Sequence, residues 1–377
     1  MRASDGALYI GLMSGTSLDG IDAVLVAGLP GRSDVAAHHH QPFDTALRTE
    51  LLALNSPGGA DELPRAARAA NAVADAYAQA AHALLAAAGL APGAVRALGA
   101  HGQTVRHQPD QGWTVQLLSG ARLAEATGID VVCDFRARDV AAGGQGAPLV
   151  PAFHQARFGG QPQTAVLNLG GIANLSLLGA APTGFDCGPA NVLLDAWVAR
   201  HRPGTLYDAD GAWAASGQVL PALLARLRAE PYFALPPPRS TGRDRFHLAW
   251  LDAHLAQEPP ARPQDVQATL LALTTTTIAA DLRAYAPATQ LLIVCGGGTL
   301  NRALMAALRA ALPGVRVEAS DAHGLPAMQV EATAFAWLAA RFMQGLPGNL
   351  PAVTGALGER VLGCWYPSGH PQPTRAG

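Results

Sequence analysis

The chain has 377 residues, of which 49% are hydrophobic and 14% charged, and its formal net charge at pH 7 is −2. This length predicts two domains, each large enough for its own core. The balanced charge argues against a nucleic-acid-binding protein and favours a small-molecule ligand. No apolar run is long enough for a membrane helix and the first residues lack a secretory pattern, so we expect a cytoplasmic protein without a membrane partner.

All 26 basic side chains are arginines, because the sequence contains no lysine. Lysine is required by the Walker A phosphate loop, by protein kinases and by Schiff-base enzymes, so these classes are excluded. Any nucleotide would have to be held by backbone N–H groups, a metal and arginine. The cysteines are widely spaced, so we expect reduced, buried thiols rather than a zinc site or a disulfide framework; they are Cys133, Cys187, Cys295 and Cys364.

The N-terminal segment predicts two strands, residues 9–13 and 21–26, joined by the small-residue turn SGTSLDG. Successive N–H groups in such a turn can hold a phosphate without the helix that a P-loop requires. Asp19-Gly20 is also an ordinary hairpin turn, and this structural interpretation stays open.

Residues 60–90 predict one long helix that ends at Gly89, and residues 95–100 predict a strand that leads into His101. Polar residues at the end of a buried strand are where α/β folds bind ligands. His101 and His107 lack the spacing of a metal-binding helix, so we interpret them as hydrogen-bonding groups. A purely structural role is equally open for His107.

A strand over residues 114–118, a helix capped by Ser119 and closed by Gly128, and a strand over residues 129–135 come next. The last strand ends in a charged cluster and a glycine-rich loop. These features predict a binding loop in which an arginine forks a carboxylate or phosphate, and the alternative is a solvated salt-bridge cluster; the charged residues are Asp134, Arg136, Arg138 and Asp139.

The middle of the chain repeats the pattern of strand, small-residue turn and strand. Gly170-Gly171 separates two apolar runs and predicts a tight hairpin in which the glycines have positive φ or approach a ligand closely. Two such hairpins suggest a duplicated fold. Asp186 then precedes Pro189 and a helical pattern, and since proline suits the first helical position, we expect Asp186 at a helix N-terminus with a low pKa.

The remaining segments offer weaker indications. Asp208 and Asp210 form either a divalent-ion site or an Asp-rich turn, and the proline-rich residues 236–243 predict an irregular, mobile loop over a site. Residues 266–285 predict a helix.

Residues 290–295 predict a strand that is followed by Gly296, Gly297 and Gly298 and a helix over residues 299–312, a pattern that brings a nucleotide to a helix N-terminus. Glu331, in the first turn of a helix over residues 329–343, either complements the helix dipole or binds substrate.

Seven segments, in order, resemble the anhydro-N-acetylmuramic acid kinase family: MSGTSLDGIDAVL, AHGQTVRHQP, DFRARDVAAGGQGAPLVPAFH, LNLGGIANLS, FDCGPANVLLDAW, CGGGTLN and GLPAMQVEATAFA. The resemblance implies an α/β, two-domain, duplicated ribonuclease H-like fold of the actin, sugar-kinase and Hsp70 superfamily, with ATP in the interdomain cleft. We expect domains at residues 1–150 and 151–360, with a final helix that can cross back, and a tail at 361–377. Domain closure is expected from the superfamily.

Family members convert 1,6-anhydro-N-acetylmuramate, ATP and water into N-acetylmuramate 6-phosphate and ADP in peptidoglycan recycling. The resemblance implies Asp186 as the catalytic base, Mg²⁺ bound through the ATP phosphates with its protein ligands unknown, and a homodimer. It implies ATP binding by Gly15, Thr16, Ser17, Leu18, Asp19, Gly20, Ile21, Asp22, Gly170, Gly171, Gly296, Gly297 and Gly298, and substrate binding by His101, Arg136, Asp139 and Glu331. Cys187 and Ala190 stand where the family pattern suggests Thr and Gly.

Other functions stay open on the sequence. A hexosamine kinase of the same superfamily would phosphorylate a free 6-hydroxyl group without water, and a catalytically silent sugar-sensing protein would keep the binding residues without turnover. A dinucleotide-dependent oxidoreductase is the weakest alternative, because no glycine cluster matches GxGxxG.

Overall fold

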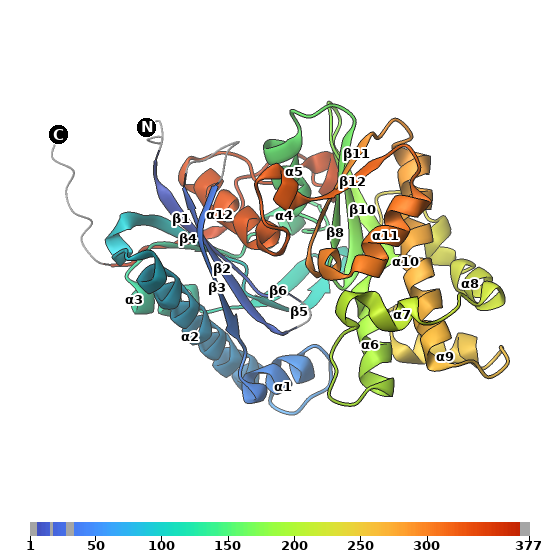
Figure 1. Cartoon of the computed structure of the whole chain (residues 1–377). Helices are drawn as coiled ribbons and strands as arrows, with labels where there is room; N and C mark the ends of the chain where they lie inside the picture. The colour runs from blue at the N-terminus through green and yellow to red at the C-terminus, as the bar shows by residue number, and fades with distance from the viewer. Residues whose placement is uncertain (1–5, 16–17, 28–33, 370–377) are drawn as a thin grey trace. The chain divides into compact units, whose positions relative to one another are not determined.

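The computed structural model describes residues 6–15, 18–27 and 34–369 (Figure 1). The chain forms two compact units, the first made of Met1–Arg157 and Gln329–Gly377 and the second of Phe158–Met328. The first unit therefore contains helix α12 (Val330–Met343). The second unit ends at residue 328, whereas we expected the second domain to span residues 151–360; the final helix crosses back to the first unit, as that expectation allowed.

The first unit is built on a six-stranded sheet with the order β13-β7-β4-β1-β2-β3. Strands β1, β2 and β3 are antiparallel neighbours, whereas β4 and β7 run parallel to β1. Residues 364–366, expected in the tail, form β13 and pair antiparallel with β7. The bounds are β1 Leu8–Met13, β2 Gly20–Ala27, β3 Asp34–Pro42, β4 Val95–Ala100, β7 Val131–Cys133 and β13 Cys364–Tyr366.

The second unit repeats this topology in a five-stranded sheet with the order β10-β9-β8-β11-β12. Its first three strands are antiparallel neighbours, and its last two run parallel to β8. Counted within each sheet, both have the strand order 3-2-1-4-5, and β13 is a sixth strand at the edge of the first sheet. This repetition confirms the duplicated ribonuclease H-like fold. The bounds are β8 Thr164–Leu169, β9 Ile172–Leu177, β10 Thr183–Pro189, β11 Leu291–Cys295 and β12 Arg316–Ala319.

Helices and one small hairpin complete the units. In the first part of the chain these are α1 Thr45–Leu54, α2 Glu62–Ala88, β5 Gln103–Gln108, β6 Trp113–Leu117, α3 Gly120–Thr127, α4 Ala137–Ala141 and α5 Val150–Phe158. After them come α6 Asn191–His201, α7 Ala212–Ala215, α8 Pro221–Arg228, α9 Leu248–Leu255, α10 Pro263–Tyr285, α11 Arg302–Ala311 and α13 Pro351–Thr354. The expected caps are confirmed: Gly89 ends α2 in the left-handed region, and the Ser119 side chain accepts the Arg122 N–H of α3.

Strand β1 shows how alternation places a helix on each face of the first sheet. Ile10 and Leu12 are buried in one core cluster with residues of α2. Gly11 points to the other face, where α12 lies, and its register partner on β4 is Gly99. A Cβ at Gly11 would overlap the Ala332 carbonyl, and one at Gly99 would overlap the Phe335 carbonyl. The two glycines therefore let α12 approach the sheet closely.

Gly99→Ala is expected to destabilise the protein by about 2 kcal/mol or more, because overpacking against backbone cannot be relieved by a side-chain rotation. Gly93→Ala is the matched control, since a Cβ there meets no atom within 4 Å. Urea unfolding of both variants checks this. Equal midpoints for the two variants would show that α12 is not held by this contact.

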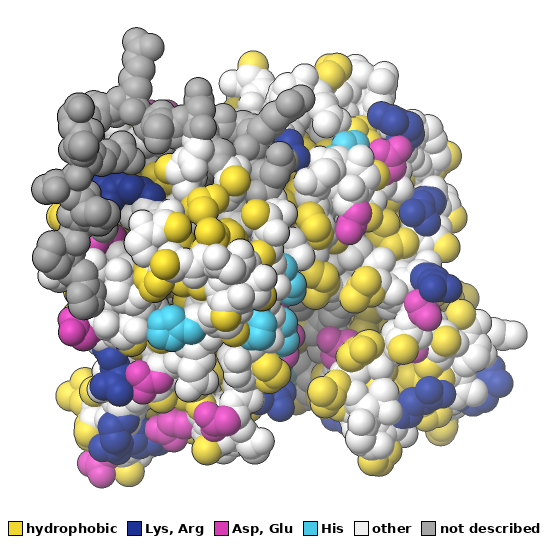
Figure 2. All heavy atoms as spheres, turned by 60° about the vertical axis from the view of Figure 1, so that its left-hand side comes forward, with side chains coloured by type: hydrophobic (Ala, Val, Ile, Leu, Met, Phe, Trp, Pro, Cys, Tyr) yellow, Lys and Arg dark blue, Asp and Glu magenta, His cyan; other side chains and the backbone are white. Residues whose placement is uncertain are grey.

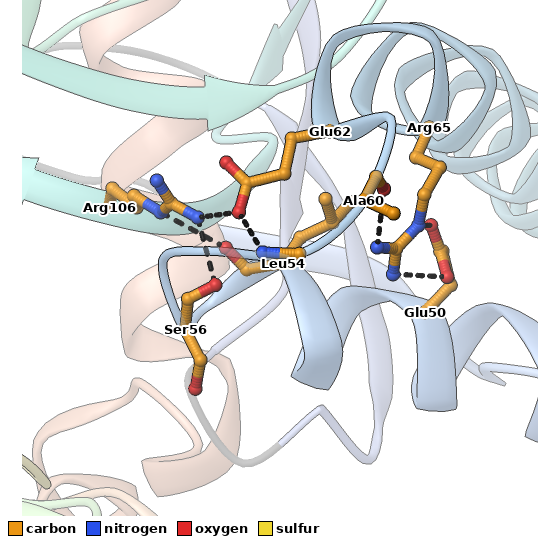
Figure 3. Close-up of polar contacts among 8 residues, drawn as sticks. Glu50, Leu54, Ser56, Ala60, Glu62, Arg65 and Arg106 are labelled. Atoms are coloured by element: carbon orange, nitrogen blue, oxygen red, sulfur yellow. Dashed lines mark hydrogen bonds and ion pairs between the residues drawn. The ribbon is translucent and has the colours of Figure 1, made fainter.

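Arg106 on β5 holds the loop between α1 and α2 (Figure 3). Its Nη2 donates to the Ser56 carbonyl (2.9 Å) and to Glu62 Oε1 (3.0 Å), and its Nε donates to the Leu54 carbonyl (3.3 Å). The Arg106 side chain therefore joins β5 to the segment that precedes α2.

Charged residues make up 14% of the sequence. On the face drawn in Figure 2, arginine side chains are scattered and interleaved with acidic ones. Among the described residues, none of the helices is long and apolar enough to span a membrane.

Candidate active site

The first glycine-containing turn is anchored at its start by buried polar contacts. The Ser14 hydroxyl donates to the Gly102 carbonyl (3.1 Å) and is hydrogen-bonded to the Tyr77 hydroxyl (2.8 Å). The Gly15 carbonyl accepts from the Leu18 N–H (3.3 Å) and from Gln103 Nε2 (3.2 Å). Gly15 is therefore fixed to the segment that follows β4. Thr16 and Ser17 lie outside the described residues.

The later residues of this turn divide between surface and core. Asp19 is exposed, whereas Leu18 and Ile21 are 1% and 0% exposed, so only their backbone could meet a ligand. A Cβ at Gly20 would overlap the Gln41 carbonyl and the His40 ring, so the packing of β2 against β3 requires glycine at this position. Asp22 accepts from His38 Nε2 (3.2 Å) and His40 Nδ1 (3.0 Å), and although burial opposes them, these hydrogen bonds lower the pKa of Asp22.

His101, directly after β4, is a neutral hydrogen-bonding group. Its Nδ1 lies 3.2 Å from the Ser14 carbonyl, which can only accept, so Nδ1 carries the proton and Nε2 is an acceptor. Arg136 donates to this Nε2 from Nε (3.2 Å) and Nη2 (3.0 Å). Burial, with the Arg136 charge, lowers the pKa of His101 to about 3, and the ring lies 4.8 Å from that of Phe335.

Arg136 follows β7 and brings three predicted substrate residues together. Its Nη1 donates to the Gly146 carbonyl (2.8 Å) in the glycine-rich loop. Burial lowers the pKa of Arg136 to about 10, while the charges of Glu331 and Asp139 favour its ionised form, so it is cationic at pH 7. His101, Arg136 and Glu331 thus form one group at the ends of β4 and β7 and the start of α12. Arg138 is exposed.

Asp139 is fully buried and does not face solvent. Its Oδ1 accepts from Asn349 Nδ2 (2.7 Å) and from the Thr354 hydroxyl (2.8 Å), and its Oδ2 accepts from the Gly146 N–H (2.8 Å). The carboxylate therefore holds the glycine-rich loop in place. Direct substrate contact by Asp139, which the family resemblance implies, does not fit this geometry, because the carboxylate is buried and both of its oxygens accept these hydrogen bonds.

Asp186 is not at a helix N-terminus. It lies inside β10, opposite Asn174 of β9, and Pro189 ends this strand instead of starting α6. The first N–H groups of α6 are used by the second hairpin: Ala190 and Val192 donate to the Gly171 carbonyl (both 3.0 Å), and Asn191 donates to the Gly170 carbonyl (3.1 Å). No helix dipole therefore acts on Asp186 in the expected way.

The expected low pKa of Asp186 is wrong for the same reason. Burial raises the pKa of Asp186 to about 7, against the smaller effects of the Thr241 N–H and the Arg239 charge. Thr241 N donates to Oδ2 (2.9 Å), and Oδ1 accepts no hydrogen bond from the described residues. Such a carboxylate can remove a proton near neutral pH.

The Gly170-Gly171 turn leaves space beside the backbone. Neither residue is among the described glycines with positive φ, so of the two expected reasons for glycine here only close approach to a ligand stays open. A Cβ would have its nearest neighbour at 3.8 Å for Gly170 and at 3.9 Å for Gly171, which is ordinary van der Waals contact. The fold itself therefore tolerates a side chain at either position.

Gly171→Ala is expected to leave the free energy of unfolding within about 0.5 kcal/mol of the wild type, as for substitutions away from strained sites. If a phosphate lies against this turn, the added methyl group should weaken ATP binding at least about tenfold, a cost of about 1.4 kcal/mol. Calorimetric titration with a non-hydrolysable ATP analogue measures this. Unchanged affinity would remove the second hairpin from the ATP site.

The glycine triplet after β11 does not open a helix. Gly296 has φ of 82°, Gly297–Leu300 is a 3-10 turn, and α11 starts only at Arg302. The first turn of α11 is already capped, because Asn301 Oδ1 accepts the Leu304 N–H (2.9 Å). The triplet offers a glycine-lined backbone beside β8, rather than a free helix N-terminus.

Asp208 and Asp210 form a turn rather than a cation site. The Asp208 carboxylate accepts the N–H groups of Trp213 (2.9 Å) and Ala214 (2.8 Å), and Asp210 pairs with Arg302 (3.1 Å). In the described ranges, no three His, Cys, Asp or Glu side chains are placed to hold a metal.

A sequence model of the anhydro-N-acetylmuramic acid kinase family matches residues 7–368. Proteins of that name from Variovorax paradoxus and Bordetella petrii are both 58% identical to the chain; the alignments cover 96% and 97% of this chain and 100% and 98% of the relatives. The chain belongs to the anhydro-N-acetylmuramic acid kinase family. It is therefore a kinase, an enzyme that uses ATP.

Three polar residues around Asp186 in this kinase were not found from the sequence. They are Tyr232, Arg239 and Asp281, of which Arg239 lies in the proline-rich segment that we expected to be mobile. The segment is irregular as expected, but the Arg239 side chain is 3% exposed and is ion-paired with Asp281 of α10. Asp281, which lies among the apolar residues of α10, could have indicated a buried ion pair, because charged groups are rarely buried unless they are paired.

Proposed function

We propose that the chain hydrolytically opens the 1,6-anhydro ring of 1,6-anhydro-N-acetylmuramate and phosphorylates O6 with ATP. The products are N-acetylmuramate 6-phosphate and ADP, and the reaction serves peptidoglycan recycling. Family membership supports the reaction. The single observation that carries the mechanism is the Asp186 carboxylate, whose pKa is near 7 and whose Oδ1 is unengaged by the described residues.

In the proposed mechanism, Asp186 acts as the general base. It takes a proton from a water molecule, whose oxygen attacks the anomeric carbon of the sugar. The bond between this carbon and O6 breaks, and O6 then attacks the γ-phosphorus of ATP, so that ADP leaves. Asp186 returns the proton to solvent. General bases contribute about 10²- to 10⁴-fold in rate, and the phosphoryl step depends mainly on positioning and electrostatics.

The ATP phosphates are proposed to bind backbone N–H groups of the two glycine-containing turns, with the nucleoside near the glycine triplet. This assignment keeps Gly15, Asp19, Gly20, Asp22, Gly170, Gly171, Gly296, Gly297 and Gly298, together with the backbone of Leu18 and Ile21. Mg²⁺ is proposed to bind through the phosphates, since it keeps several waters and needs only one or two carboxylates. The exposed Asp19 is suited to supply one of them.

The sugar is proposed to bind His101, Arg136 and Glu331. The substrate carries a lactyl carboxylate, hydroxyl groups and an acetamido group, which match a cationic guanidinium, a neutral imidazole and a carboxylate. Two of the five Arg136 N–H donors, one each on Nη1 and Nη2, are free of the contacts to His101 and Gly146. Asp139 supports this set through the glycine-rich loop.

A coupled ADP-release assay with Mg-ATP and the anhydro sugar in ¹⁸O-labelled water tests the proposal. We expect ADP and a 6-phosphorylated sugar with the label at the anomeric oxygen. ADP release only with free amino sugars would indicate a hexosamine kinase, and no ADP with either sugar would indicate a sensor. A cytoplasmic location and a homodimer are part of the proposal, and sedimentation velocity tests the dimer.

A further inference from the structure

Besides its strand partners, Asp186 is hydrogen-bonded to residues of the proline-rich segment and of the turn before it. Its carbonyl accepts hydrogen bonds from the Tyr232 hydroxyl (2.8 Å) and from Arg239 Nε (3.0 Å), and its N–H donates to the Arg239 carbonyl (3.1 Å). The N–H of Thr241, two residues beyond Arg239, holds the carboxylate itself. The segment from Arg239 to Thr241 thus forms hydrogen bonds with both the backbone and the side chain of Asp186.

Arg239 is itself fixed on every side. Its Nη1 donates to the Leu235 carbonyl (2.5 Å), its Nη2 pairs with Asp281, and its guanidinium lies 5.3 Å from the ring centroids of Phe185 and Tyr232. Burial is the largest single effect and opposes its charge, but the hydrogen bond and charge of Asp281, together with the smaller effects of Tyr232 and Cys187, raise the pKa of Arg239. The cation next to Asp186 is therefore permanent.

Asp281 contacts both the Arg239 guanidinium and Cys187, the residue that follows Asp186 on β10. Its side chain is 10% exposed, and besides Arg239 it accepts a hydrogen bond from the Cys187 thiol. A threonine hydroxyl could donate in the same way, which explains why Cys187 fits where the family pattern suggests Thr. Buried ion pairs are weak sources of stability because both charges must be desolvated.

We propose that Arg239, held by Asp281, is a positioning residue for Asp186, one that fixes the direction of the carboxylate and favours its ionised form. This inference rests on the proposed function of Asp186 as the base. A residue that merely pinned the proline-rich segment would affect folding and leave the pH dependence of the reaction unchanged, so the pH profile separates the two roles.

The charged and titratable groups around Asp186 determine what the pH profile can report. They are Arg239 from the proline-rich segment, Tyr232 from the 3-10 turn Pro231–Ala234, Cys187 on β10 and Asp281 on α10. Burial raises the pKa values of Tyr232 and Cys187, so both stay neutral near pH 7. Burial also raises the pKa of Asp281, against its hydrogen bond and ion pair with Arg239. Asp186 is the carboxyl group whose pKa is about 7, and Arg239 is the cation next to both carboxyl groups.

The first test is the single-turnover rate of sugar phosphorylation as a function of pH. Arg239→Gln is expected to shift the acid limb upward by about one pH unit or more, because a neighbouring cation lowers a carboxyl pKa by about that amount. The plateau rate should fall about 10- to 100-fold through misplacement of the base, with KM for the sugar within twofold. A wild-type acid limb would overturn the proposal.

Arg239→Lys and Arg200→Gln complete this experiment. Arg239→Lys keeps the positive charge but loses the several N–H donors of the guanidinium. The acid limb of its pH profile should therefore stay near the wild-type position while the rate falls. Arg200 forms an exposed bidentate pair with Asp252 in the same unit, and its variant should match the wild type in both respects. Thermal unfolding shows which variants are folded. If Arg239→Gln does not fold, the kinetics of Arg239→Lys and the formate rescue of Asp281→Ala test the positioning role instead.

Chemical rescue tests the role of Asp281 separately. A cavity of about 300 Å³ borders Asp281 and is lined further by Phe233, Thr277 and Ala280. Asp281→Ala should lower the rate about 10- to 100-fold, and added formate, which can enter this cavity and pair with Arg239, should restore it several-fold. Formate should not rescue Asp186→Asn. No recovery in folded Asp281→Ala would overturn the role of Asp281.

The failure of this inference differs from the failure of the proposed function. If Asp186→Asn keeps its activity, Asp186 is not the base and the proposed mechanism falls. If Asp186→Asn is inactive but Arg239→Gln keeps the wild-type acid limb, only the positioning role is lost.

Discussion

Asp186→Asn is expected to lower kcat by about 10²- to 10⁴-fold, the usual contribution of a general base. ATP affinity should stay nearly unchanged, because the proposed phosphate contacts come from backbone N–H groups elsewhere. The amide keeps one oxygen that can accept the Thr241 N–H, so the local backbone has no reason to move. The coupled ADP-release assay measures kcat, and calorimetric titration with an ATP analogue measures binding.

The control for this variant is Asp252→Asn, an exposed aspartate of the same unit that pairs with Arg200. It should have wild-type kcat. Retention of more than about a tenth of the wild-type kcat by Asp186→Asn would remove Asp186 from the role of base, given the usual scale of general-base catalysis.

The raised pKa of Asp186 gives the same variant a signature in stability. A carboxyl group whose pKa is higher in the folded state, here about 7 against 3.8, contributes fully below pH 3.8 and loses this contribution as the pH rises through 7. Above pH 7 the buried charge therefore costs up to about 4 kcal/mol, at about 1.4 kcal/mol per pKa unit. Asp186→Asn should melt higher than the wild type at pH 8, and wild-type kcat should fall below pH 7.

The fold was largely predictable because its main features are local. Both hairpins appear as apolar runs separated by small residues, and their repetition indicated a duplicated fold before any strand order was known. The return of α12 to the first unit was expected only through the family resemblance and could not be derived from the residues, since the sequence of an apolar helix does not show which sheet it covers. The one indication in the sequence is the pair Gly11 and Gly99, where the absence of a side chain lets the backbone of α12 lie close to the sheet.

The site was predictable in its residue types and less so in its electrostatics. The position of Asp186 before Pro189 suggested a helix N-terminus, but the strand continues to Pro189 and the helix N–H groups are occupied by the Gly170-Gly171 turn. The pKa of Asp186 is set by burial and by groups more than 50 residues away in the sequence, Arg239 and Thr241. Local patterns cannot supply such contacts.

Arg136→Gln is expected to lower kcat/KM for the anhydro-muramate by about 10²- to 10³-fold, because truncating one partner of a buried charged contact costs about 2 to 5 kcal/mol. The variant would leave Nε2 of His101 without its bidentate donor and Glu331 without the neighbouring cation. If the guanidinium also binds the lactyl carboxylate, the loss should be much smaller for 1,6-anhydro-N-acetylglucosamine, which lacks that group. Steady-state kinetics with both sugars measures the difference.

Arg138 provides the comparison, because it has the same charge two residues away but is exposed. Arg138→Gln should change kcat/KM less than about twofold, as expected for an exposed charge. If Arg138→Gln shows the substrate-dependent loss and Arg136→Gln does not, the carboxylate binds at Arg138. Equal losses with both sugars in Arg136→Gln would mean that Arg136 only orients His101, since orientation of the imidazole is needed whichever sugar is bound.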